Sequence, residues 1–544
     1  MNTLAIGWGS DDFSFMMYDP ARAYDVDSGT VIENVYDTLV GYKGNSMTDI
    51  EGRLAESWTL ENNDQSYRFK LRTGVKFHSG NPFTCADAEY SLRRNLVTNH
   101  PLSSNWFLSE SLLGTAANAN ADSTINFARI AVAVKCDGND LVLTMTKYDP
   151  ALLAKLAYSG QSVVDSKHAI AVGEWDGTEA TWKKWVGAEL LKGGLAAKPS
   201  GTGPYKVVSL GDKELKFTAF DGHWAGKPSI QNVVMRAEPD ADKRLKDFLA
   251  GRTDLGAVPR SKVKGQPGVA VLEDLPITNT DALYLNQNIK PSPYLGSGQL
   301  DGQGIPADFF KDVNVRRGFV AALDVAGVMA SLPNPNGKIE GFVLPEGFPS
   351  YERIEPPKFD MAAAEKALRA AWSGQVWEKG FKFDIPVYDT DPQQNPYLVN
   401  LKDNLAKMNP KFVINFVKRS DNPNFEEALA PIGPASWYAD YADADNIVYS
   451  YFAPGAYNAV RAGINSPQLE NYIRDGRSAL IPALRGDVYR KTAELANDQA
   501  LYIILPSYPA ARSYRDVVQG LTRENYNPLR NFAILWKDLS KSKS

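Results

Sequence analysis

The pattern of apolar and polar residues along the chain predicts short strands that alternate with amphipathic helices. Residues 3–8 form an apolar run typical of a buried strand, and strict alternation over Tyr67–Arg72 indicates a half-buried strand. Apolar residues recur at helical spacing from Gly29 to Tyr42 and again from Val313 to Ala330. Interleaved strands and helices of this kind predict an α/β fold with mixed sheets.

Two local signals are sharper than the general pattern. Thr84 followed by Asp87 is typical of a capping box, so we expect a helix to begin there. The runs Ile130–Val134 and Leu141–Thr146 predict a β-hairpin, with Asp137-Gly138 as its turn. Both signals lie in the first third of the chain, which is therefore expected to contain its own strands and helices.

A β-α-β unit is predicted later in the chain. Its parts are the strand Phe381–Tyr388, the helix Pro396–Met408 and the strand Phe412–Val417. Such a unit favours parallel strands and a right-handed crossover. Ligands bind outside the carboxyl ends of strands in these folds. Tyr388 lies at such an end, and the loop that follows Gly433 comes soon after the second strand.

Composition indicates an ordinary globular protein with more than one domain. The 544 residues allow about two to four domains at roughly 100–200 residues each. Hydrophobic residues make up 44% of the chain and the net charge is −5, with Lys and Arg scattered along it. We therefore expect no nucleic-acid partner, because a clustered basic surface is missing. No apolar run reaches the ~18–20 residues of a membrane span.

Residues that bind metals or carry out acid–base chemistry are scarce. Two cysteines, Cys85 and Cys136, form no CxxC pair, and either one disulfide or two buried thiols fits their number. The four histidines are far apart in sequence, and no nucleophile elbow, HExxH or phosphate-binding loop occurs. The sequence therefore predicts no metal centre, no cofactor and no enzymatic activity.

The start of the sequence leaves the compartment open. Met1 leads directly into the predicted strand over residues 3–8, with no signal peptide before it. An exported protein without its leader and a cytosolic protein both begin in this way.

The most unusual stretch is residues 434–446, which contain three aromatic and three acidic side chains: Trp437, Tyr438, Tyr441, Asp440, Asp443 and Asp445. A calcium loop would need a glycine at position six and a glutamate at position twelve, and neither is present. Composition alone favours core packing for the aromatic residues. A buried carboxylate between two tyrosines needs a partner, however, so Asp440 is a candidate ligand residue. Asp445 is expected only to cap a helix over 447–452.

Several motifs, in this order along the chain, resemble those of one protein family. They are Leu54-Ala-Glu-Ser-Trp58, Tyr67 to Gly80, Thr84 to Arg93, Gly201-Thr-Gly-Pro-Tyr205, Asp312 to Arg317 with Ala322-Leu-Asp324, and Trp437-Tyr-Ala-Asp-Tyr-Ala-Asp443. Over nearly its whole length the chain is similar to the extracytoplasmic solute-binding proteins of ABC transporters, in the family (family 5) that holds dipeptide-, oligopeptide- and nickel-binding proteins.

The resemblance implies a two-lobed, Venus-flytrap fold of the periplasmic-binding-protein type. Two crossing strands near Leu272–Asn286 and Leu501–Ser507 would form the hinge. Residues 1–45, 199–275 and 507–544 would make the main domain of the first lobe. Residues 46–198 would be its extra domain, and residues 276–506 the second lobe.

The same resemblance implies a ligand site. Asp440 holds the position of the aspartate that pairs with a peptide's ammonium group in peptide-binding relatives, and its neighbours Trp437, Tyr438, Ala439 and Tyr441 belong to the same motif. Tyr24, Asp25 and Val26 match the lip of the first lobe that meets the ligand backbone. Tyr388 and Trp106 are further candidates for pocket walls. Relatives often carry prolines where this chain has Ala442 and Ala444, which leaves the pose of Asp440 open.

The function implied is that of a receptor that captures peptides and delivers them to the membrane permease of an ABC importer. We expect a monomer that is extracytoplasmic, either periplasmic or a cell-surface lipoprotein, and that meets the membrane only through the permease or a lipid anchor. An oligosaccharide or chelated nickel is the alternative ligand. A secreted hydrolase is the alternative of another class.

Overall fold

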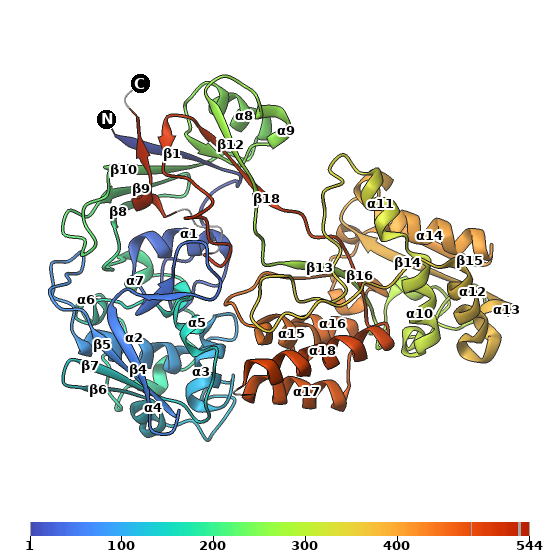
Figure 1. Cartoon of the computed structure of the whole chain (residues 1–544), viewed down its shortest axis with the longest axis horizontal. Coiled ribbons are helices and arrows are strands. Elements are labelled where there is room, and N and C mark those ends of the chain that lie inside the picture. The colour runs from blue at the N-terminus through green and yellow to red at the C-terminus, as the bar shows by residue number, and fades with distance from the viewer. Residues whose placement is uncertain (1, 480, 531–534, 543–544) are drawn as a thin grey trace. The chain divides into compact units, whose positions relative to one another are not determined.

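The computed structural model describes residues 2–479, 481–530 and 535–542, and the chain folds into two compact units (Figure 1). Unit 1 comprises Met1–Pro276, Asp440–Ala442 and Pro509–Ser544, and unit 2 comprises Ile277–Ala439 and Asp443–Tyr508. The chain therefore passes between the units near the two predicted crossing strands, and three residues around Tyr441 belong to unit 1. Within the described part of the chain, no helix has the length and apolar character needed to cross a membrane.

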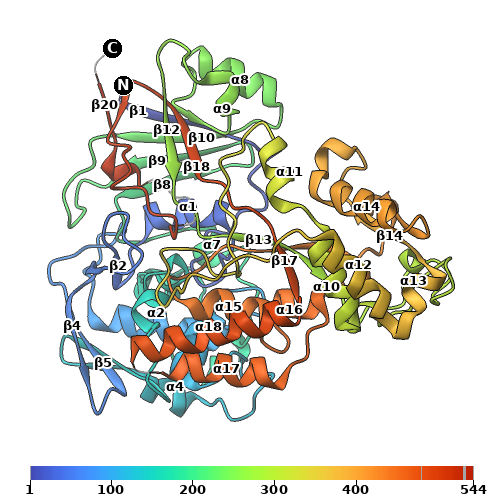
Figure 2. The same ribbon diagram turned by 45° about the vertical axis from the view of Figure 1, so that its right-hand side comes forward.

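Unit 1 contains a seven-stranded mixed sheet (Figure 2). Its order is β12-β18-β11-β1-β10-β9-β8. The strands are β1 (Thr3–Trp8), β8 (Tyr205–Leu210), β9 (Glu214–Ala219), β10 (Asn232–Ala237), β11 (Leu255–Gly256), β12 (Val269–Leu275) and β18 (Ala510–Arg515). The central strand β1 is parallel to both of its neighbours, β10 and β11, so their carboxyl ends share one edge of the sheet. The strand predicted over residues 3–8 is confirmed.

A second sheet of unit 1 has the order β4-β5-β7-β6 and packs with α2 (Figure 1). These elements are β4 (Ala55–Glu61), β5 (Ser66–Leu71), β6 (Val134–Asp137), β7 (Asp140–Thr144) and α2 (Cys85–Thr98). Helix α2 begins as predicted, because the Asp87 carboxylate accepts hydrogen bonds from the backbone N–H and hydroxyl of Thr84. A disulfide joins Cys85 to Cys136 and links the start of α2 to β6, which settles the alternative left open by the sequence.

The predicted hairpin is correct in its turn and second strand but wrong in its first strand. The pairing strand is Val134–Asp137, and residues 127–133 form helix α4 (Phe127–Ala133) instead. The reason is local, since the Asn126 side chain accepts a hydrogen bond from the backbone N–H of Arg129 and caps a helix there.

Helix α1 (Val26–Val35) is shorter than the apolar pattern predicted, and Val40–Tyr42 form strand β2. The helix ends where Gly201 and Gly203 pack against it. A Cβ atom on Gly201 would lie 2.2 Å from the carbonyl oxygen of Val35, so only glycine fits this approach. The close packing fixes α1, and with it the residues that precede the helix.

Unit 1 also contains further short strands and helices. They are β3 (Ile50–Gly52), α3 (Asn105–Leu113), α5 (Leu152–Leu156), α6 (Ser166–Ala171), α7 (Gly194–Ala197), α8 (Ala241–Leu249), α9 (Arg260–Val263), β19 (Val518–Gln519) and β20 (Ser540–Lys541). One hydrophobic cluster includes residues of both sheets, such as Leu4 of β1 and Phe69 of β5. Tyr441 belongs to this cluster.

Unit 2 contains a three-stranded antiparallel sheet and a two-stranded parallel one. The first has the order β16-β13-β17, with β13 (Thr280–Leu285), β16 (Ile432–Trp437) and β17 (Tyr502–Ile504). The second pairs β14 (Phe381–Val387) with β15 (Phe412–Lys418), and α14 (Pro396–Met408) connects them. The predicted β-α-β unit and its parallel strands are confirmed.

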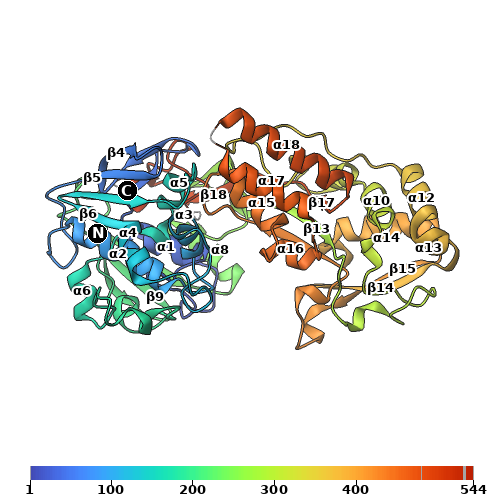
Figure 3. The same ribbon diagram turned by 90° about the horizontal axis from the view of Figure 1, so that it is seen from below.

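Unit 2 also contains several helices, of which α15, α16, α17 and α18 lie together (Figure 3). The helices are α10 (Val313–Ala322), α11 (Val325–Ser331), α12 (Met361–Ala370), α13 (Gln375–Lys379), α15 (Ala444–Phe452), α16 (Tyr457–Ala462), α17 (Pro467–Ser478) and α18 (Pro482–Asp498). The single helix predicted over Val313–Ala330 is wrong. Asp324 caps a new helix by accepting a hydrogen bond from Gly327 N–H, which divides the segment into α10 and α11.

Candidate functional site

Asp440 belongs to a chain of hydrogen bonds with two of the other candidate site residues in unit 1. The Tyr24 hydroxyl donates to Asp440 Oδ2 at 3.0 Å, and the Trp106 indole N–H donates to the Tyr24 hydroxyl oxygen at 3.3 Å. These three residues come from distant parts of the sequence, and Asp440 is only 7% exposed. The structure therefore brings Tyr24, Trp106 and Asp440 into one hydrogen-bonded chain.

The electrostatics of this chain keep Tyr24 neutral. Burial, together with the nearby charge of Asp440, raises the pKa of the Tyr24 hydroxyl well above its ordinary value. A neutral phenol donates its proton to a carboxylate without neutralising the carboxylate's charge. The Tyr24 hydroxyl therefore holds the Asp440 carboxylate in place as a neutral donor.

Tyr441 anchors the segment that carries Asp440. Its ring is fully buried and lies 5.3 Å from the ring of Phe107, edge to face. The Lys155 ammonium lies 5.3 Å from the centre of the same ring. Lys155 is itself held by Asp149, at 2.7 Å, and Ser111, at 3.0 Å. The structure thus gives Tyr441 a packing position next to the candidate charge.

The alanine that follows Tyr441 takes part in the same anchoring. The backbone N–H of Ala442 donates to the Tyr42 hydroxyl at 2.9 Å. A proline at this position would have no N–H to donate. Ala442, one of the two departures from the family pattern, therefore contributes a bond that the proline cannot form.

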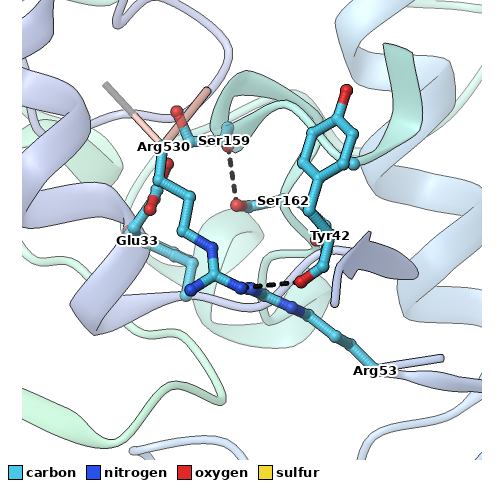
Figure 4. Close-up of a pocket in the computed structure, with 9 residues that line it drawn as sticks. Glu33, Tyr42, Arg53, Ser159, Ser162 and Arg530 are labelled. Carbon is cyan, nitrogen blue, oxygen red and sulfur yellow. Dashed lines mark hydrogen bonds between the residues drawn. The ribbon is translucent and has the colours of Figure 1, made fainter. Parts of the chain in front are cut away.

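Tyr42 lines a small pocket of about 10 Å³, which has room for about one water molecule (Figure 4). The Arg530 guanidinium donates to the Tyr42 carbonyl oxygen at 2.7 Å. Glu33 faces the same pocket, and its Oε2 atom is buried with no hydrogen-bond partner among the described residues. Burial raises the pKa of Glu33 to about 7, although Arg530 and Arg53 act in the opposite direction.

The helix after the candidate site begins at Ala444, three residues earlier than the predicted range 447–452. Asp443 is the N-cap of α15, because its carboxylate accepts from the backbone N–H of Asp445 at 2.9 Å. Asp445 was expected to be the cap, and that prediction is wrong: Asp445 forms an ion pair with Arg477 at 2.5 Å. Ala444 is the first helical residue, a position where proline is well accommodated.

The Asp443 carboxylate forms an ion pair with an arginine of unit 2. Two bonds, of 2.8 and 2.6 Å, join its carboxylate to the Arg485 guanidinium, and both side chains are buried. Burial raises the pKa of Asp443, while the hydrogen bond and charge of Arg485 lower it. This carboxylate is neutralised by an internal cation, which indicates a structural role.

A cavity of about 540 Å³ opens in unit 1 at the carboxyl ends of β1 and β11. Its lining consists of Ile6, Gly7, Trp8, Gly9, Ser10, Val26, Asp27, Thr30, Leu255, Gly256, Ala257, Val258, Arg260, Ala511, Arg512, Ser513 and Trp536. The volume is in the ~300–1,000 Å³ range of small-molecule sites. Val26 lines this cavity and Tyr24 bonds Asp440, so the segment Tyr24–Val26 connects the two features.

Among the cavity residues, only Val26 was predicted from the sequence. The others gather because β11 and β18 follow β1 in the sheet order, which places Trp8, Leu255 and Arg512 around one space. Trp8 at the carboxyl end of an apolar strand was the available signal. Burial and the charge of Asp25 raise the pKa of Asp27, while a hydrogen bond with Trp8 lowers it.

The remaining predicted residues are placed separately. Asp25 caps α1 by accepting from Ser28 N–H at 2.8 Å. Trp437, Tyr438 and Ala439 belong to unit 2, where Trp437 is half-buried and Tyr438 is 48% exposed. Tyr388 is 76% exposed and lies against the Arg419 guanidinium, 3.9 Å from the ring centre.

In the described residues, no group of three or more His, Cys, Asp or Glu side chains is arranged to hold a metal ion. The chemistry that the arrangement supports is reversible binding. A buried carboxylate accepts a hydrogen bond from the Tyr24 hydroxyl, and Val26, two residues after Tyr24, lines a ligand-sized cavity.

Comparisons with known proteins agree with this assignment of chemistry. The model of the bacterial extracellular solute-binding proteins, family 5 (middle region), matches residues 49–459. The heme-binding protein A of Haemophilus influenzae is 25% identical over 490 residues, covering 87% of this chain and 81% of that protein. The dipeptide-binding protein of Escherichia coli K12 is 22% identical, covering 94% and 90%.

Comparison with solved structures shows the same fold. The periplasmic binding protein DppA from Helicobacter pylori, solved in complex with the peptide STSA, matches with a TM-score of 0.73 at 21% identity. The match covers 99% of this chain and 98% of that one. The predicted two-lobed α/β fold class is confirmed. The chain belongs to family 5 of the bacterial extracellular solute-binding proteins.

Proposed function

We propose that the protein is the solute-binding receptor of an ABC importer, and that it captures short peptides and delivers them to a membrane permease. The observation that carries the proposal is the Asp440 carboxylate, held by the neutral Tyr24 hydroxyl and anchored by Tyr441. An α-ammonium group is the cation that this carboxylate takes. Relatives named as dipeptide-binding and di/tripeptide-binding proteins support the choice of ligand.

Binding of the ammonium group provides the free energy for capture. A ligand shifts a conformational equilibrium only by its difference in affinity for the two states. An ammonium–carboxylate pair shielded from water would favour the closed form, as in hinge closure around a ligand. In the proposal, residues 1–45, 199–275 and 507–544 form the main domain of the first lobe, residues 46–198 its extra domain and residues 276–506 the second lobe.

The family indicates the compartment and the partners that we propose for the protein. Its members are extracellular by name, and we place this protein in the periplasm or at the cell surface as a lipoprotein. It acts as a monomer, with the peptide and the permease as its partners. Tyr24, Asp25, Val26 and the cavity beside them meet the ligand backbone, while Trp106 and Trp437 form walls.

One experiment distinguishes a peptide from the other candidate ligands. Heme is a candidate because one relative is a heme-binding protein, and an oligosaccharide or chelated nickel would be held without an ammonium group. Native mass spectrometry of the purified protein, followed by calorimetry with Ala-Ala-Ala, hemin, maltotriose and nickel–histidine, separates them. We expect a retained peptide mass and binding of Ala-Ala-Ala alone. Binding of one of the other probes in place of the peptide would overturn the proposal.

A hydrolase would alter its ligand, and a receptor releases it intact. Incubation of the protein with Ala-Ala-Ala and recovery of the peptide at unchanged mass is therefore expected. Appearance of Ala-Ala or free alanine above the level in a buffer control would contradict the receptor role.

A further inference from the structure

Unit 1 contains a further cavity, of about 210 Å³, where charged side chains from distant parts of the chain come together. Glu33 of α1, Arg53, His223 and Arg530 are among the residues that line it. The volume is many times the ~10–15 Å³ that one water molecule needs, and it is smaller than the ~300–1,000 Å³ typical of drug-sized ligands. The cavity shares Glu33, Arg53 and Arg530 with the small pocket of Figure 4. Its described lining residues all differ from those of the cavity of about 540 Å³, so the two cavities are separate.

Two arginines line this cavity without an ion-pair partner. In the part of the chain that the structure describes, no carboxylate oxygen lies within 4.0 Å of a side-chain nitrogen of Arg53 or Arg530. Arg530 is 6% exposed, and its Nε atom has no hydrogen-bond partner among the described residues. Burial, together with the charge of Arg53, lowers the pKa of Arg530 to about 10, although nearby acidic residues act in the opposite direction. An anionic group of a ligand would give the two guanidinium groups the bidentate partner that they lack here.

The fold places the Arg53 side chain against a glycine. Gly41 lies in β2, and a Cβ atom on it would be 2.2 Å from Arg53 Nε and 2.7 Å from Arg53 Cζ. A side chain at Gly41 would therefore displace the guanidinium. The backbone of Arg53 is also fixed, because its N–H donates to the Leu39 carbonyl oxygen at 3.0 Å and its carbonyl oxygen accepts from Arg72 Nε at 2.9 Å. The position of this guanidinium thus depends on a neighbour that has no side chain.

Two buried acceptor atoms face the same cavity. Glu33 Oε2 and His223 Nε2 have no hydrogen-bond partner among the described residues, and His223 is 6% exposed. The other ring nitrogen of His223, Nδ1, lies 3.1 Å from the carbonyl oxygen of Gly226. A carbonyl oxygen only accepts, so Nδ1 carries the proton. Burial lowers the pKa of His223 and keeps the ring neutral, which leaves Nε2 as an acceptor.

Acidic residues of the lining disfavour a ligand that is purely anionic. Asp37 Oδ2 lies 3.9 Å from His223 Nε2, and it accepts hydrogen bonds from the neutral groups of Thr202 and Trp224. Glu51 also lines the cavity. These carboxylates would repel a dianion such as phosphate, and they would attract an ammonium group. The lining therefore fits a ligand that carries both charges.

We infer that this cavity is a second ligand site, contained within unit 1, that binds a small zwitterion of the class of free α-amino acids. The carboxylate of the ligand pairs with Arg53 and Arg530. Its ammonium group donates to Glu33 Oε2 and His223 Nε2. A carboxylate alone or an ammonium group alone would leave half of these buried groups without a partner, whereas a zwitterion satisfies both halves. The inference goes beyond the proposed peptide-binding function and does not depend on it.

Calorimetry with four small probes tests whether both charges are required. Glycine carries both charges, acetate only the carboxylate, methylammonium only the ammonium group, and trimethylglycine both charges but no N–H group. We expect glycine to bind and each of the other three probes to bind about tenfold more weakly or worse, because each change removes a charge-assisted hydrogen bond. Glycine should also raise the melting temperature, since a ligand that binds only the folded state stabilises it.

Two variants test the residues that hold the carboxylate. Arg53→Gln removes one guanidinium and Gly41→Ala displaces it, so each should weaken glycine binding about tenfold or more. Arg236→Gln, whose arginine forms an exposed ion pair with Glu214 on the sheet of unit 1, is the matched control and should bind glycine as the unaltered protein does. Melting temperatures show which variants are folded. If Gly41→Ala is not folded, Arg53→Gln decides the matter alone.

A third variant, Asp440→Asn, separates this cavity from the proposed peptide site. It should retain glycine binding, because Asp440 is not among the described residues of the lining. Loss of glycine binding in this variant would assign glycine to the peptide site and overturn the inference. The inference also fails if glycine does not bind the unaltered protein at millimolar concentrations, if acetate binds as well as glycine, or if Arg53→Gln binds glycine unchanged. Peptide binding is measured separately with Ala-Ala-Ala, so either proposal can fail while the other holds.

Discussion

Two buried aspartates three residues apart, Asp440 and Asp443, are held in opposite ways. The hydroxyl of Tyr24, a neutral group, donates one hydrogen bond to Asp440. The guanidinium of Arg485, a cation, donates two hydrogen bonds to Asp443. The guanidinium neutralises its partner, and the phenol leaves the charge of its partner in place. The difference teaches that two buried carboxylates of one motif can have donors of different kinds, a neutral phenol at Asp440 and a charged guanidinium at Asp443.

The largest effect is expected at the structural member of the pair. Asp443→Asn retains a side chain that caps α15 but leaves Arg485 buried without a counter-charge. Removing one partner of a buried ion pair typically costs ~3–5 kcal/mol, so the free energy of unfolding should fall by about that amount. Urea denaturation measures it. Asp487→Asn removes only exposed ion pairs, with Arg490 and Lys491, and should cost less than about 1 kcal/mol.

Substitution by proline should change the stability of the protein differently at Ala442 and at Ala444, the two positions where relatives often carry proline. Ala442→Pro removes the N–H that bonds to the Tyr42 hydroxyl and should destabilise the protein by about 1–3 kcal/mol, since a buried hydroxyl loses its donor. Ala444→Pro changes the first residue of α15, where proline is accommodated, and should change stability by less than about 0.5 kcal/mol. Equal melting temperatures for the two variants would contradict this account of the anchoring.

A smaller effect than at Asp443 is expected at the phenol that donates to Asp440. Tyr24→Phe keeps the ring but removes the hydroxyl, which should weaken peptide binding by about 1 kcal/mol, or roughly fivefold, while the fold is retained. Calorimetry with Ala-Ala-Ala measures the change. Tyr148→Phe, at a half-buried tyrosine four residues after β7, serves as a control and should bind with unchanged affinity.

The parts of the fold that the sequence predicted well carry strong local signals. The apolar strand β1, the capping box at Thr84 and the β-α-β unit with Pro396 at the start of its helix all agree with the structure. The failures occur where a short polar side chain interrupts an apolar pattern. Asn126 starts a helix in a run that reads as a strand, and Asp324 divides a run that reads as one helix.

The candidate site was predictable only in part. The resemblance pointed to Tyr24, Trp106 and Asp440, but their hydrogen bonds depend on long-range folding, since Tyr24 and Asp440 are 416 residues apart. The cap at Asp443 was missed because Asp445 offers the same side chain two residues later. The cavity residues were missed because the sheet order, rather than any sequence motif, brings Trp8, Leu255 and Arg512 together.

The central claim is that the charge of Asp440 binds the ammonium group of a peptide. The most direct measurement is a calorimetric cycle with Ala-Ala-Ala and its N-acetylated form, on the unaltered protein and on Asp440→Asn, with the exposed Asp403→Asn as control. The account predicts that either change alone weakens binding by ~3–5 kcal/mol, a factor of hundreds or more, and that the second change then adds little. Unchanged affinity of Asp440→Asn for Ala-Ala-Ala, or full independence of the two changes, would contradict it.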